Sequence, residues 1–180
     1  MQKLSSTVAV AIITCLWVIF DYINLITLHS LQSNPHLYTV YWLAGFRLLA
    51  IILFGYVGYI GIFLGYVISG ILLRHFSVID ALSLGFLSST ATLIAYKLWQ
   101  RFTEKSDEFH AVSFVQLFYL VALNGLITSL FRFSYLEVAN KNYPISMLIG
   151  TFAANVTGAL IFLYLLKIFT LIYQRLKIAS

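Results

Sequence analysis

The amino-acid sequence predicts an all-α, polytopic membrane protein that forms a single domain over residues 1–180, with about six transmembrane helices. The first observation is that 61% of the residues are hydrophobic and 9% are charged, against roughly 45–50% and about 25% in soluble domains. The second is a mean hydropathy of +0.93. Folding hides only about 70% of the surface of a chain this long, so the surplus must face lipid. The third is that the apolar runs are continuous, which favours helices over alternating barrel strands.

The first half of the chain contains three predicted spans. A helix needs about 20 apolar residues to cross a membrane, and the first run covers 8–28. We interpret this run as a retained helix rather than a signal peptide, because no small-residue cleavage site follows it. The spans 40–56 and 58–73 are shorter, and the glycines around Gly55 indicate a tight turn between them. One span followed by a re-entrant segment is the alternative for this region.

The second half contains three further predicted spans, at 81–99, 111–131 and 145–166. The polar stretch 97–110 is the predicted aqueous loop between the first two of them.

The distribution of basic residues predicts the orientation of the six spans. With the N-terminus inside, the inner segments hold seven basic residues and the outer loops hold three. This excess predicts that both termini are cytoplasmic, and we expect the membrane to be the bacterial cytoplasmic (inner) membrane. The seven are Lys3, Lys97, Arg101, Lys105, Lys167, Arg175 and Lys177, and the three are Arg74, Arg132 and Lys141.

Two rows of small residues stand at four-residue intervals, one on the third predicted span and one on the sixth. Helices in lipid associate by close packing of small residues, so each row predicts a contact with a neighbouring helix. The contact is interpreted as intramolecular, and a homodimer through one of the rows is the alternative. The rows are Gly61, Gly65 and Ser69, and Gly150, Ala154 and Gly158.

Two ionisable residues lie well inside predicted spans, Asp21 on the first and Arg47 on the second. Such residues are costly in a membrane and are therefore functional candidates. A short loop joins the first two spans, so Arg47 is expected to reach Asp21. The pair is either a structural ion pair or part of an anion-binding site.

Further polar residues lie near mid-membrane or at the outer ends of spans. They predict a speculative ligand-binding cavity that opens to the outside, and interhelical hydrogen bonds are the alternative. The six candidates are Asp21, Asn24, Arg47, Asn124, Arg132 and Asn155.

No pattern in the sequence indicates catalysis, and the composition excludes a soluble enzyme or a nucleic-acid-binding domain. The single cysteine, Cys15, lies in an apolar helix without an adjacent base and is expected to be inert. The histidines do not stand at metal-binding spacing, so no metal site is expected. Ser88 and Thr92 are expected to bond to their own helix backbone. The sequence gives no indication of a cofactor.

Three stretches resemble the first membrane-associated sensor domain family. They run from Trp42 to Gly55, from Gly61 to Gly65, and onward from Asn155. Members of that family have about eight spans and are fused to a histidine kinase or a cyclic-di-GMP enzyme. This chain differs, because Arg47 stands where an apolar residue is usual and Asn155 stands where Asp is frequent. The resemblance implies a membrane input or docking module whose output partner is a separate protein.

Three functions are therefore expected from the sequence. The first is a non-enzymatic membrane sensor or scaffold that docks to another membrane protein or to a second copy. The second is a small-solute binding or transport subunit with an outward-facing polar cavity. The third is an accessory subunit of a respiratory or photosynthetic membrane complex. All three place the chain in a lipid bilayer, and none involves nucleic acid.

Overall fold

The computed structural model describes four stretches of the chain: residues 5–28, 40–103, 114–139 and 144–179. Within these stretches all regular structure is helical, which confirms the predicted class. The helices are α1 (Ser6–Leu28), α2 (Leu43–Phe54), α3 (Tyr56–Leu72), α4 (Val78–Thr103), α5 (Phe114–Val138) and α6 (Ile145–Ala179).

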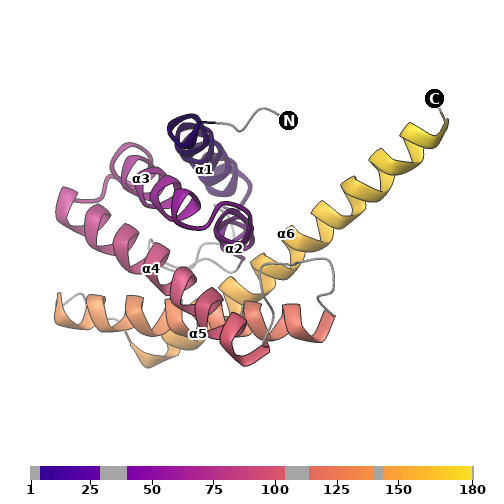
Figure 1. The fold of residues 1–180 in the computed structure, drawn as a ribbon. Coiled ribbons are helices and arrows are strands. Elements are labelled where there is room, and N and C mark those ends of the chain that lie inside the picture. Colours follow the sequence, from indigo (N-terminus) through magenta and orange to yellow (C-terminus); the bar gives the residue numbers. More distant parts are fainter. Residues whose placement is uncertain (1–4, 29–39, 104–113, 140–143, 180) are drawn as a thin grey trace.

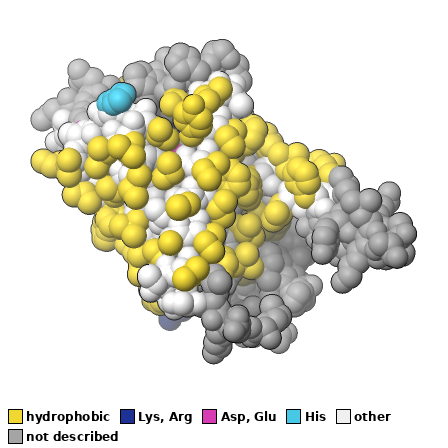
Figure 2. All heavy atoms as spheres, turned by 90° about the horizontal axis from the view of Figure 1, so that it is seen from above, with side chains coloured by type: hydrophobic (Ala, Val, Ile, Leu, Met, Phe, Trp, Pro, Cys, Tyr) yellow, Lys and Arg dark blue, Asp and Glu magenta, His cyan; other side chains and the backbone are white. Residues whose placement is uncertain are grey.

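Four of these helices, α1, α4, α5 and α6, are long and apolar enough to cross a membrane. Hydrophobic side chains cover much of the described surface in Figure 2, as expected of a protein whose exterior meets lipid. The other two helices are short, with 12 residues in α2 and 17 in α3. They measure about 18 and 25 Å at 1.5 Å per residue. The structure therefore shows four helices able to span, and six spans remain a prediction.

The predicted turn between the second and third spans is confirmed at Gly55. This residue has a φ of 55° and its N–H donates to the carbonyl of Ile51, which ends α2. Only glycine adopts such a backbone conformation without strain. The helical part of the predicted 40–56 span is shorter than expected, because the chain becomes helical only at Leu43.

Helices that follow one another along the chain also pack side by side, except that α1 packs mainly on α3 (Figure 1). The short helix α2 lies in the middle and contacts all five other helices. Its side chains Leu43, Leu48 and Ile51 are fully buried. The apolar core is therefore arranged around the shortest helix.

The row of small residues on α3 packs against α1, as predicted for an intramolecular contact. A Cβ atom on Gly65 would lie 2.6 Å from Cβ of Trp17, and one on Gly61 would lie 2.7 Å from Cγ2 of Ile13. Ser69 accepts a hydrogen bond of 3.2 Å from the indole N–H of Trp17. The residue numbers of the contacting positions increase together along α1 and α3, so the two helices run parallel.

The row on α6 packs against the start of α2. A Cβ atom on Gly158 would overlap the backbone carbonyl of Tyr41, and the Tyr41 N–H donates to the carbonyl of Ala154 at 3.1 Å. Gly158 and Ala154 thus serve intramolecular packing. Gly150 is half-buried, and its part in packing remains a prediction.

These contacts place the first residue of α2 deep within the bundle. Ala154 and Gly158 stand 9 and 13 residues after Ile145, the first residue of α6, which is about 14 to 20 Å along the helix. That depth is near the centre of a hydrocarbon layer of about 30 Å. Helix α2 then runs beside α6, because Gly45 lies against Ala159 and Phe162. It is a short helix whose N-terminus lies level with the middle of the apolar stretch Ile145–Phe169 of α6.

Candidate functional site

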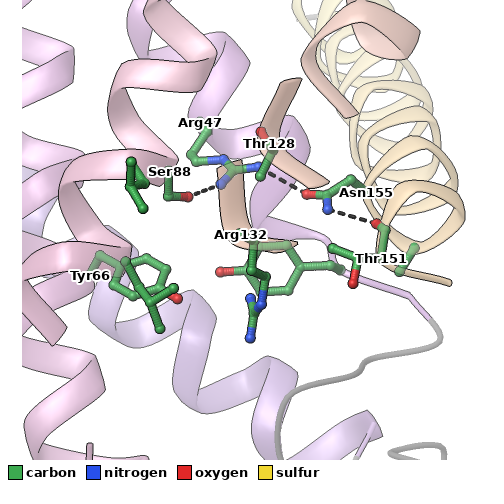
Figure 3. Close-up of a pocket in the computed structure, with 11 residues that line it drawn as sticks. Arg47, Tyr66, Ser88, Thr128, Arg132, Thr151 and Asn155 are labelled. Atoms are coloured by element: carbon green, nitrogen blue, oxygen red, sulfur yellow. Dashed lines mark hydrogen bonds between the residues drawn. The ribbon is translucent and has the colours of Figure 1, made fainter. Parts of the chain in front are cut away.

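A small polar cavity lies in front of the N-terminus of α2, in the middle of the bundle (Figure 3). Its volume is about 30 Å³, room for one or two water molecules or for a compact polar group. Residues of α3, α4, α5 and α6 complete its wall. The lining residues are Tyr41, Arg47, Tyr66, Leu84, Leu87, Ser88, Thr128, Arg132, Thr151, Ala154 and Asn155.

Arg47 is the central cation of this cavity, and its side chain is 1% exposed. One terminal nitrogen donates to the hydroxyl of Ser88, and the other donates to Oδ1 of Asn155 at 2.9 Å. The guanidinium also lies 5.8 Å from the ring centre of Tyr41. Helical side chains lean toward the N-terminus of their helix, which directs Arg47 back into the cavity. All these partners are uncharged, and Nε has none.

Arg132 contributes a second guanidinium to the same cavity (Figure 3). It stands on α5 six residues before Val138, the last residue of that helix. Its Nε and one terminal nitrogen are buried without a hydrogen-bond partner, and the same is true of the hydroxyl of Thr128 one turn away. The cavity therefore holds several donors that the protein itself leaves unused.

The prediction that Asp21 and Arg47 form an ion pair is wrong. Asp21 instead forms a salt bridge with Arg74, in which Nε donates to Oδ2 at 3.1 Å and a terminal nitrogen donates to Oδ1. The cause is the packing order, because α1 lies along α3 and brings Asp21 level with the residues that follow α3. Asp21 and Arg47 therefore belong to two different sites, the salt bridge with Arg74 and the cavity.

No acidic side chain is among the residues that line the cavity. In the described part of the chain, Asp21 binds Arg74, Asp80 accepts hydrogen bonds from Tyr135 and Ser77, and Glu137 is exposed. The cavity thus carries one buried arginine, Arg47, and one half-buried arginine, Arg132, without a carboxylate in its wall.

Three of the six predicted ligand residues line this cavity: Arg47, Arg132 and Asn155. The other three do not. Asp21 is tied to Arg74, whereas the amide groups of Asn24 and Asn124 are fully buried with no hydrogen-bond partner. The interhelical hydrogen bonds that were the alternative for these two amides are therefore not formed.

Sequence reasoning missed five polar residues of the cavity. Ser88 was expected to bond to its own helix but receives the hydrogen bond from Arg47, whereas Thr92 does bond to the carbonyl of Ser88 at 3.0 Å. A signal was present, because polar residues recur at four-residue intervals on α5 and α6. The missed residues are Tyr41, Tyr66, Ser88, Thr128 and Thr151.

The set of donors indicates which chemistry fits this cavity. A guanidinium presents planar N–H groups that match the oxygens of a carboxylate, phosphate or sulfate. Two such groups beside hydroxyls and an amide form a site for an oxyanion. Comparisons with protein families, with curated proteins and with solved structures found no match to this chain.

Proposed function

We propose that this protein is a membrane-embedded binding protein for a small anion, acting as the binding or transport subunit for a solute with a carboxylate, phosphate or sulfate group. The observation that carries the proposal is that two arginines, the buried Arg47 and the half-buried Arg132, line one cavity that has no carboxylate in its wall. This corresponds to the second of the three functions expected from the sequence.

The energetics of a membrane interior support an anionic ligand. An arginine at the centre of a transmembrane helix costs about 2.5–3.5 kcal/mol on insertion scales and more in the absence of water. Two of them in one cavity also repel each other. An anion would remove both costs, and the N-terminus of α2 adds a favourable dipole at the same place, as in other half-length membrane helices.

Ligand-dependent stability tests this proposal. The protein in mild detergent is heated with increasing inorganic phosphate, sulfate or acetate, and the unfolding midpoint is recorded. A ligand that binds the folded state alone stabilises it by about 2.7 kcal/mol at one hundred times its Kd. We expect a saturable rise for at least one of these anions in the wild type, and its loss in Arg47→Gln and Arg132→Gln.

The matched control is Arg101→Gln, which removes an exposed arginine of α4 outside the cavity. It should keep the full anion-dependent rise despite the same change in net charge. If none of the three anions gives a saturable rise, or if Arg47→Gln responds as the wild type does, the proposal is wrong.

A sensor or docking function is the second candidate, and one feature of α6 favours it. This helix has 35 residues, about 52 Å in length, and its C-terminal end extends past the bundle in Figure 1. A helix that continues beyond the membrane can carry anion occupancy to a partner, in keeping with the sensor-family resemblance. Purification in mild detergent tests it, because a chain that binds the anion but runs alone as a monomer contradicts docking.

The accessory-subunit function and the bacterial inner membrane location remain predictions.

A further inference from the structure

One face of α5 carries a row of polar side chains that the protein does not satisfy. Asn124, Thr128 and Arg132 stand four residues apart and so lie above one another on the same side of the helix. Five of their polar atoms are buried with no hydrogen-bond partner: both amide atoms of Asn124, the hydroxyl of Thr128, and Nε with one terminal nitrogen of Arg132.

The neighbouring residue Ser129 shows that this is not a general property of α5. Its side chain is fully buried, as Asn124 is, but its hydroxyl donates to the carbonyl of Gly125 at 2.8 Å. The unsatisfied atoms are therefore confined to one face, the face that lines the cavity at Thr128 and Arg132.

The row leads from Arg132, near the end of α5, to the level of the hydrogen bond between Arg47 and Asn155. Arg132, Thr128 and Asn124 stand about 9, 15 and 21 Å from Val138 along the helix. Gly125 packs against Val156, with a Cβ distance of 2.9 Å to Cγ2, so Asn124 lies at the depth of Asn155. Asn155 accepts a hydrogen bond from Arg47, and the row thus reaches the middle of the apolar stretch of α6.

Unsatisfied polar atoms in such a row indicate water. Each buried group without a partner costs about 1–3 kcal/mol, and buried water normally satisfies groups of this kind where two to four polar partners converge. The cavity of about 30 Å³ beside Thr128 and Arg132 has the space for it.

We infer that the cavity continues along α5 as a hydrated polar path from Arg132 to Asn124, which delivers a compact, water-soluble anion to the bilayer centre. Its ligand class is a hydrated oxyanion or short carboxylate rather than a lipid headgroup, because an acyl chain does not fit a path lined by unsatisfied donors. The ligand rests on the proposed function, whereas the path rests only on the atoms of α5.

Thiol accessibility tests the path. The native Cys15 is first replaced (Cys15→Ala), and single cysteines are introduced as Thr128→Cys and Asn124→Cys. The protein is reconstituted in phosphatidylcholine vesicles and treated with the anionic, water-soluble reagent 2-sulfonatoethyl methanethiosulfonate, and modification is followed by intact-protein mass. A thiol reacts as the thiolate, which forms in water and not in an apolar environment.

Two matched controls lie on the same helix. Ser129→Cys is buried at the depth of Thr128 but off the unsatisfied face, and Leu126→Cys replaces a side chain that is 45% exposed on the apolar surface. We expect Thr128→Cys and Asn124→Cys to react at least about tenfold faster than both controls. Because it is deeper, Asn124→Cys should be the slower of the two.

Equal rates at all four positions would overturn the path. Cysteine is close in size to threonine, so Thr128→Cys should fold. If Asn124→Cys does not fold, the labelling rates of Thr128→Cys and Arg132→Cys test the path instead. Inorganic phosphate separates this inference from the proposed function. If labelling is fast and is not slowed by phosphate, sulfate or acetate, the path is supported and anion binding is contradicted. If an anion stabilises the protein but labelling is no faster than in the controls, anion binding is supported and the path is overturned.

Discussion

Three arginines of this protein, the buried Arg47 and the half-buried Arg74 and Arg132, have different surroundings. Arg74 forms a salt bridge with Asp21, and the side chains are 8% and 2% exposed. Arg47 and Arg132 have only uncharged partners or none. The salt bridge joins α1 to the residues that follow α3, whereas the cations of the cavity have no counter-charge in its wall. In our proposal the same residue type therefore serves structure at one site and anion binding at the other.

Breaking the closed pair should destabilise the protein without affecting anion binding. Asp21→Asn leaves the Arg74 guanidinium buried without its carboxylate, and removing one partner of a buried pair costs about 3–5 kcal/mol. We expect a loss of about 3 kcal/mol in the free energy of unfolding, measured by titration with a denaturing detergent.

The double variant Asp21→Asn/Arg74→Gln should recover part of that loss, because no charge is left uncompensated. Glu137→Gln removes an exposed carboxylate and should change the stability by less than about 0.5 kcal/mol. If Asp21→Asn unfolds as the wild type does, the salt bridge does not stabilise the fold.

The sequence could identify these residues but not all of their partners. Asp21 and Arg47 were singled out because charges inside apolar runs are rare, and both are buried. Their pairing was inferred from a short connection, and that inference failed because neighbours in sequence need not be neighbours in a helix bundle. Arg74 was counted with the loops, since it follows the last apolar residues of the third span.

At the scale of elements, the short helix α2 determines where the cavity forms. It begins level with the middle of the apolar stretch of α6, because Tyr41, two residues before its first residue, rests on α6 at Gly158. Irregular backbone at this depth is tolerated only where it is buried in protein or lines a polar cavity. The position of α2 thus depends in part on a close contact that glycine permits at position 158.

Gly158→Ala should therefore damage both the fold and the site. The added methyl group would overlap the Tyr41 backbone, and overpacking of this kind costs typically 1–3 kcal/mol. We expect a loss of stability in this range and a weaker anion-dependent rise of the unfolding midpoint, because α2 moves away from α6 and carries Arg47 with it.

Gly85→Ala is the matched control on α4. Its methyl group would lie 3.4 Å from the ring of Tyr66, an ordinary contact, and alanine favours a helix by up to about 1 kcal/mol over glycine. Its stability should be unchanged or slightly higher. Equal effects of the two substitutions would show that the Gly158 contact does not position α2.

Patterns in the sequence predict which helices form and how they pack better than they predict where each helix begins and ends. The turn at Gly55 and the packing rows on α3 and α6 follow from glycine spacing, which is a local property. The late start of α2 was not predictable, because residues 40–42 are as apolar as the helix that follows. Whether such residues become helical is decided by the α6 backbone, which lies more than 100 residues away in sequence.

At the scale of the whole molecule, the contacts of α3 lead to a prediction about the two alternatives for residues 40–73. The parallel contacts between α1 and α3 place Gly61 near Val10 and Gly65 near Trp17. Tyr56 at the start of α3 therefore lies level with the start of α1, and Arg74 lies near its far end. In this arrangement α3 traverses the bundle while α2 occupies only half of its depth.

This arrangement predicts the sides on which three positions are labelled. In the Cys15→Ala background, single cysteines replace Tyr56, Val78 and Arg101, which are all exposed. A membrane-impermeant maleimide is added to vesicles of known orientation. We predict that α3 and α4 each cross the membrane, so Tyr56→Cys should react from the same side as Arg101→Cys, and Val78→Cys from the opposite side.

The unmodified chain is the control for leakage, since its single cysteine, Cys15, lies on the apolar surface of α1 and should react from neither side. A re-entrant α2–α3 hairpin would instead turn back within the membrane. Tyr56→Cys would then react from the side of Val78→Cys or not at all, and the predicted crossing by α3 would be wrong.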